Sequence, residues 1–150
     1  MRNKFKKTLV VIVGILGILF LGFALMRWLF NDHEFHHGDL NYYLLTDKEF
    51  RQFPVIGAKP AKVLYKSYIQ DGTAPEMLKM AYDSSVSFAE ALRIFKDKCN
   101  KLKYTFLPTE SQKDFLVYTT KGEYEEICIR VKPINRVACS VTVTFVKRLN

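Results

Sequence analysis

The sequence predicts an α+β protein, with an N-terminal transmembrane helix followed by one antiparallel β-sheet that carries a single helix packed on one face. Three observations lead to this fold class. Residues 8–26 are apolar and uncharged, residues 88–102 repeat apolar side chains at helical spacing, and the flanking segments alternate apolar and polar residues as strands do. The expected order of the folded part is β-hairpin, α-helix, β-meander.

The N-terminal helix has the length of a membrane span. The run TLVVIVGILGILFLGFALM, residues 8–26, covers about 28 Å at ~1.5 Å per residue, close to the thickness of a bilayer's hydrocarbon core. Because Lys and Arg resist translocation, we expect residues 1–7 to be a cytoplasmic basic tail and residues 8–30 a signal anchor. The C-terminal domain would then be extracytoplasmic. A cleaved signal peptide fits less well, because GFALMRW contains no small-x-small cleavage site.

The net charge of +8 belongs mainly to this N-terminal segment. Five of the 23 Lys and Arg residues lie within residues 1–30, whereas all 15 acidic residues lie beyond them. The rest of the chain is close to neutral, so its composition argues against a nucleic-acid-binding protein. The expected partners are the membrane lipid bilayer and another envelope protein.

Residues 31–52 are predicted to form a juxtamembrane linker with a short helix, and they hold every histidine of the chain. If the preceding helix continued, His33, His36 and His37 would share one face and could bind zinc or copper. The polar density of NDHEFHHGDL and its glycine favour a hydrated linker instead. A metal site at the three histidines and a pH-sensing role remain alternatives.

Two capping patterns predict helix starts. Thr46 and Glu49 have capping-box spacing, which predicts a short helix that ends before Pro54. Ser87 and Glu90 have the same spacing at the start of the longer helix. The apolar stripe of that helix consists of Phe88, Ala91, Leu92, Phe95, Cys99 and Leu102.

Strands surround this helix within a folded domain predicted over residues 53–150. The runs 62–70 and 76–84 flank the turn residues DGTAP and predict a hairpin. The meander is predicted from the runs 103–108, 114–120, 123–132 and 136–146. A three-residue loop at 133–135 would pair Ile129 with Cys139 and Ile127 with Val141, and would turn both apolar sets toward the helix.

Three cysteines lie in this domain. Cys99 and Cys139 are both expected to face inward, so a disulfide between them is one interpretation in an oxidising compartment. Three unbridged, partly buried thiols are the interpretation we favour. Cys128 alternates with inward residues and is expected on the uncovered face of the sheet.

No catalytic motif stands out. The sequence has no nucleophile elbow, phosphate-binding loop or dinucleotide glycine fingerprint, and its histidines all precede the domain. We therefore expect a non-catalytic protein with no catalytic residues and no cofactor. Its eight tyrosines, interleaved with lysines, would either form a recognition face on the uncovered side of the sheet or pack the sheet as ordinary strand residues.

The turn at Pro54, Gly57 and Ala58, the segment SFAEALRIFKDKCNKLKYTF and the strands that run to Phe145 resemble a broad group of small membrane-anchored bacterial extracytoplasmic α+β domains. The resemblance covers residues 53–146. It implies an α+β fold and a location on the periplasmic side of a bacterial cell membrane, and it offers no catalytic residue to transfer. The predicted function is a single-pass anchored binding or scaffold protein that acts through protein–protein interaction. The alternatives are an immunity protein that neutralises an envelope-targeting toxin, and a metal- or pH-responsive sensor that uses the histidine cluster.

Overall fold

The structure is a computed structural model that describes residues 2–29, 32–68 and 75–148. The chain forms two compact units, Met1–Asn31 and Asp32–Asn150. The first unit is the helix α1, Arg2–Leu29, whose described side chains, residues 12–28, are exposed. Over the residues that the structure describes, no helix is long and apolar enough to cross a membrane.

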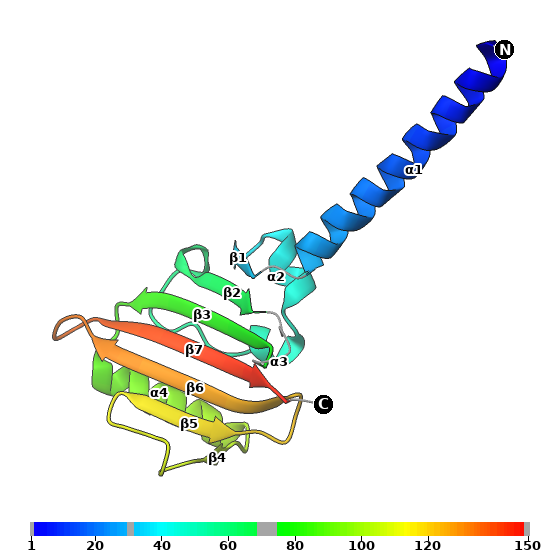
Figure 1. Ribbon diagram of the computed structural model, residues 1–150. Coiled ribbons are helices and arrows are strands. Elements are labelled where there is room, and N and C mark those ends of the chain that lie inside the picture. The colour runs from blue at the N-terminus through cyan, green and yellow to red at the C-terminus, as the bar shows by residue number, and fades with distance from the viewer. Residues whose placement is uncertain (1, 30–31, 69–74, 149–150) are drawn as a thin grey trace. The chain divides into compact units, whose positions relative to one another are not determined.

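The second unit is α+β and contains one antiparallel sheet of seven strands in the order β1-β2-β3-β7-β6-β5-β4 (Figure 1). The strands are β1 His33–His36, β2 Leu64–Tyr68, β3 Met77–Ser84, β4 Thr105–Phe106, β5 Phe115–Thr119, β6 Tyr124–Pro133 and β7 Cys139–Lys147. The helices are α2 Leu40–Leu45, α3 Lys48–Arg51 and α4 Phe88–Lys101, with a short 3-10 turn η1 at Pro60–Lys62. The α+β class, the single antiparallel sheet and the order hairpin, helix, meander are confirmed for this unit, whereas the structure does not show the predicted transmembrane helix. The predicted DGTAP turn lies outside the described residues except for Pro75.

Helix α4 forms where its capping residues predict. The Ser87 side chain accepts a hydrogen bond from the Glu90 backbone N–H at 3.4 Å, which satisfies one of the open donors of the first turn. Ala91, Phe95 and Cys99 are buried against the sheet. Leu102, predicted on the same stripe, is instead the C-cap residue and remains 39% exposed.

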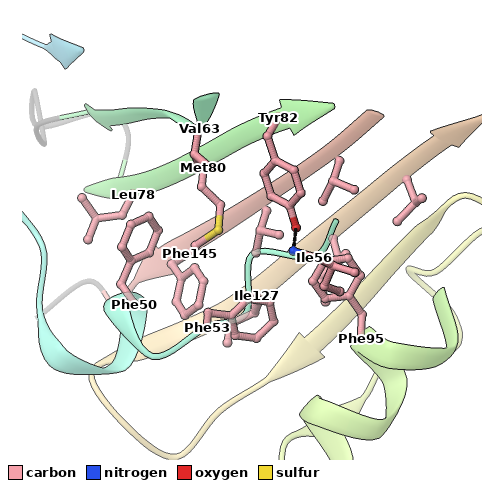
Figure 2. Close-up of a cluster of buried hydrophobic side chains, with 14 of the residues drawn as sticks. Phe50, Phe53, Ile56, Val63, Leu78, Met80, Tyr82, Phe95, Ile127 and Phe145 are labelled. Carbon is pink, nitrogen blue, oxygen red and sulfur yellow. Dashed lines mark hydrogen bonds between the residues drawn. The ribbon is translucent and has the colours of Figure 1, made fainter. Parts of the chain in front are cut away.

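Helix α4 shares the covered face with a second segment, residues 47–58, which we call the strap. The rings of Phe50 and Phe53 in the strap meet the ring of Phe145 edge-on, with centroids 5.1 and 5.3 Å away (Figure 2). The Ile56 backbone N–H donates a hydrogen bond to the Tyr82 hydroxyl at 3.1 Å. The prediction of a single covering helix was therefore incomplete, because α4 and the strap together cover this face of the sheet.

The predicted linker over residues 31–52 is wrong in its boundary. Strand β1 pairs with β2, placing Phe35 opposite Tyr65, and Phe35 is only 2% exposed. The folded unit therefore begins at Asp32 and not at residue 53. The physical reason is that the apolar ring of Phe35 is buried against the rings of Tyr65 and Tyr42, which holds the polar residues on either side of it in the strand.

Helix α3, at the start of the strap, begins one residue later than its capping pattern predicts. The N-cap of α3 is Asp47, whose carboxylate accepts from the Phe50 backbone N–H at 2.8 Å. Thr46 is buried, and its hydroxyl donates to the Tyr42 carbonyl at the end of α2. Asp47 is the N-cap of α3 because Thr46 already serves as the C-cap of α2.

The β6–β7 connection is longer than predicted. Ile129 pairs with Val143 and Ile127 with Phe145, four residues beyond the expected partners. The Asn135 side chain accepts from the Val137 backbone N–H at 2.9 Å and stabilises the wider loop. Because the shift is an even number of residues, every side chain keeps its predicted face.

Candidate interaction surface

The face of the sheet opposite α4 and the strap, which we call the open face, contains a shallow hollow of about 510 Å³. It spans the four strands β3, β7, β6 and β5. Its lining residues are Met77, Lys79, Phe115, Cys128, Arg130, Lys132, Ser140, Thr142, Thr144 and Val146. Strand β7 lies fourth of seven in the sheet, so the hollow rests on a rigid central strand.

Cross-strand pairing sets the chemistry of this surface. Thr144 lies between Lys79 and Cys128, and Thr142 lies beside Arg130 on the next row. With Ser140, these threonines form a ladder of hydroxyl groups along β7, which can both donate and accept hydrogen bonds. Cations flank the ladder on both neighbouring strands.

Arg130 is the best-positioned cation on the open face. Its guanidinium carbon lies 4.9 Å from the centroid of the Phe115 ring, which is its direct cross-strand partner. This stacking orients the planar guanidinium while leaving its N–H donors available. Among the ion pairs of the described residues, none involves Arg130, Lys79 or Lys132.

Acidic residues mark the ends of this surface. Asp83 lies opposite Ser140 on β3, and Glu126 lies opposite Val146 on β6. Burial raises the pKa of Glu126, and the charges of Glu110 and Glu125 raise it further. No carboxylate is among the residues that line the hollow itself, so the centre of the surface is positive.

Cys128 faces the open side, as the strand alternation predicts. Burial, together with the charges of Glu126 and Glu110, raises the pKa of its thiol to about 11. The thiol is therefore protonated near neutral pH and is a weak nucleophile. This cysteine contributes a small apolar side chain to the hollow.

Cys99 and Cys139 both face the covered side, as predicted, but the structure does not bring them together. Cys99 lies close to Tyr118, whose partner Ile127 pairs with Phe145. Cys139 lies six residues from Phe145 on the same strand, roughly 20 Å at ~3.4 Å per residue. A disulfide requires a Cα separation below about 7 Å, and both cysteines are free thiols here.

The three histidines are also separated by the local fold. Their predicted metal site depended on a helix continuing past residue 30, whereas residues 33–36 form a strand. Alternation along β1 places His33 and His36 on opposite faces, and the His37 ring lies 4.8 Å from that of Tyr42. Within the described parts of the chain, no group of three His, Cys, Asp or Glu side chains could hold a metal ion.

The aromatic residues mainly build the core. Five tyrosines are buried: Tyr42, Tyr65, Tyr82, Tyr118 and Tyr124. The packing interpretation therefore describes most of the tyrosines, and the open face is basic and hydroxyl-rich instead. The parity of Ser140, Thr142 and Thr144 within CSVTVTFVK could have revealed this character from the sequence.

A second polar cluster attaches the strap to the sheet and was not anticipated. The Tyr124 hydroxyl donates to Asp47, and the Tyr104 hydroxyl donates to Glu49 at 2.5 Å. Burial, followed by the hydrogen bond to Glu49, raises the pKa of Tyr104. Because each carboxylate satisfies a tyrosine hydroxyl, we interpret the cluster as structural.

Comparison of the chain with protein-family models, with curated proteins and with solved structures finds no match. The function is therefore inferred from the surface geometry and from the sequence of α1.

Proposed function

We propose that this protein is a single-pass anchor of the bacterial cell membrane whose extracytoplasmic domain binds an acidic segment of another envelope protein through the open face of its sheet. The function is binding, without catalysis. The observation that carries it is the positive hollow across β3, β7, β6 and β5, in which Arg130 is held over Phe115.

The sequence and exposure of α1 support the anchor. The helix has 28 residues, about 42 Å at ~1.5 Å per residue, and residues 8–26 of it carry no charge. Its described apolar side chains are exposed; Ile18 is 71% exposed and Phe20 is 73% exposed. The uncharged run covers about 28 Å of this helix at ~1.5 Å per residue, and its exposed apolar side chains call for an apolar environment. The basic residues before it favour a cytoplasmic N-terminus.

The charge and composition of the hollow support an acidic protein partner. Lys79, Arg130 and Lys132 can pair with carboxylates, and the hydroxyl ladder can bind backbone or side-chain polar groups. Met77, Phe115 and Val146 add apolar contact area at the same place. Interfaces typically combine such apolar contacts with oriented arginines.

Photo-crosslinking in native membranes tests the partner site. A crosslinking residue at position 142, in the middle of the ladder, should capture a protein, whereas one at Lys96, on an exposed part of α4, should not. Arg130→Glu should reduce capture from position 142 by about tenfold or more, because it replaces attraction by repulsion. Lys96→Glu is the matched charge reversal and should leave capture unchanged.

Two results would reject this site. One is equal capture with Arg130→Glu and with the unaltered chain, once circular dichroism has shown both to be folded. The other is capture from position 96 but not from position 142. Topology is tested separately with a reporter that is active only outside the cytoplasm. Fused after Asn150, it should be active, and an inactive fusion of a stable chain would contradict the proposed orientation.

A further inference from the structure

Helix α2 has apolar residues on all sides although it has only six residues. Its sequence is LNYYLL, in which Asn41 is the single residue without a large apolar side chain. Helices that are apolar all round are normally buried on all sides. The surroundings of α2 in the structure cover only half of it.

The inward half of α2 is tied to the covered side of the sheet. Tyr42 is 6% exposed, and its ring meets those of Tyr65 and Phe35 with centroids 4.9 and 6.5 Å away. Leu45 packs against the same core. These contacts fix the rotation of α2 about its axis, so its outward half is defined by the fold.

The outward half carries three large apolar side chains at helical spacing. Leu40 is 71% exposed, Tyr43 53% and Leu44 59%. Positions i, i+3 and i+4 lie on one face of a helix, so the three side chains form one continuous patch. This patch, which we call the α2 patch, is too apolar for a helix meant to face water.

The position of α2 in the chain indicates what covers the patch. Leu40 follows the end of α1 at Leu29 by eleven residues, which reach at most about 40 Å when extended. A domain anchored through α1 therefore keeps α2 within that reach of the bilayer surface. Tyrosine is enriched at the membrane interface, where its ring is in an apolar layer and its hydroxyl in water.

Charge near α2 also suits a lipid surface. Helix α3 follows two residues after α2 and exposes Lys48 and Arg51. Arg51 lines a small cavity of about 200 Å³ together with Tyr42, so this cation lies beside α2. Cations at this position can approach anionic lipid headgroups.

We propose that Leu40, Tyr43 and Leu44 insert into the interfacial layer of the membrane in which α1 is anchored, giving the domain a second membrane contact. This inference rests on the proposed anchoring of α1. Because α2 packs on the covered side of the sheet, the contact leaves the open face available to a partner. The domain would then be held in a defined orientation close to the lipid surface.

Tryptophan quenching by brominated lipids tests this contact in the full chain reconstituted in phosphatidylcholine–phosphatidylglycerol vesicles. Trp28 is the single tryptophan of the chain, so Trp28→Phe provides a silent background. Leu44→Trp in that background should lose at least half of its fluorescence when the lipids are brominated near the headgroup end of their acyl chains. Val137→Trp, at a position 69% exposed in the β6–β7 loop, is the control and should keep its fluorescence.

The same experiment separates the two proposals. Quenching of Trp28 in the native chain reports on the anchor. If Trp28 is quenched but Leu44→Trp is not, the α2 contact is wrong while the anchor stands. If Trp28 is not quenched either, the anchor itself is wrong. Equal quenching at positions 44 and 137 would also overturn the inference, because the membrane contact would then not be specific to α2. Tyr43→Trp repeats the measurement at a second position of the patch.

Discussion

Gly57 in the strap offers a stability test that can be worked out from the geometry. Its φ angle is +62°, in the left-handed region that glycine adopts at least cost. Its carbonyl accepts from both the backbone N–H and the hydroxyl of Ser85, each at 2.9 Å. A Cβ at this position would lie 2.7 Å from Ser84 Oγ and 2.7 Å from Val86 Cγ2.

The expected loss for Gly57→Ala has two parts. The left-handed backbone costs about 1–2 kcal/mol for a residue with a Cβ. Forcing a methyl group into packed surroundings costs about 1–3 kcal/mol more. We therefore expect the free energy of unfolding to fall by about 2–5 kcal/mol. At roughly 4 °C per kcal/mol for a domain of this size, the melting temperature would fall by about 8–20 °C.

Gly38→Ala is the matched control, because Gly38 also has a positive φ, +97°, but a Cβ there would meet nothing within 4 Å. It should show only the backbone part of the loss. Urea unfolding of the full chain in detergent micelles can be followed by tyrosine circular dichroism, since Trp28 lies in α1 and reports on the other unit. A loss for Gly57→Ala no larger than that for Gly38→Ala would refute the argument from close packing. So would the absence of any rescue by Val86→Ala in the Gly57→Ala background, where one of the two close contacts is removed.

Two further predictions concern titratable groups of the domain. Alkylation under denaturing, non-reducing conditions should modify all three cysteines. In the folded protein Cys128 should react first, because Cys99 and Cys139 are fully buried. A mass that shows only one modified thiol under denaturing conditions would reveal a disulfide and contradict the separation of Cys99 from Cys139. Burial raises the pKa of Tyr82 and of Tyr118 to about 12, against about 10 when unfolded, so the contribution of these groups to stability is complete below pH ~10 and is lost as the pH rises toward 12. Absorbance of tyrosinate should show at least two tyrosines that titrate only as the domain unfolds; titration of all eight near pH 10 in a folded domain would contradict this.

The sequence predicted those elements whose signal is local and periodic. Helix α4 has an amphipathic stripe and a capping serine, and strands β6 and β7 alternate cleanly, so their type and their buried faces could be read directly. The register between β6 and β7 could not, because it is set by the loop that Asn135 stabilises and not by the apolar pattern. An even shift in register leaves that pattern unchanged.

The elements that were missed depend on contacts between distant residues. Strand β1 has only four residues and one buried side chain, Phe35, and its pairing with β2 spans some thirty residues of chain. Nothing within HEFH itself distinguishes such an edge strand from a polar linker. The inward orientation of Cys99 and Cys139 was correctly predicted, because it follows from local periodicity. Their separation along the sheet was not predicted, because it depends on how α4 packs across distant strands.

The candidate surface follows from how the central strands divide their two faces. On β7, Val141, Val143 and Phe145 are fully buried under α4 and the strap, whereas Thr142 and Thr144 alternate with them on the open face. The first set belongs to the hydrophobic core, whereas the second set lies outside it and is under little constraint from folding. If the open face served only to keep the protein soluble, charged side chains scattered without order would suffice. Instead, an arginine stacked on its cross-strand phenylalanine borders a ladder of hydroxyl groups, so the guanidinium is held in place as the proposed binding requires. Arg130→Glu should for this reason weaken partner capture while leaving the free energy of unfolding within about 1 kcal/mol of the unaltered chain, because Arg130 is exposed. A large loss of stability would mean that the open face contributes to the fold instead of to binding.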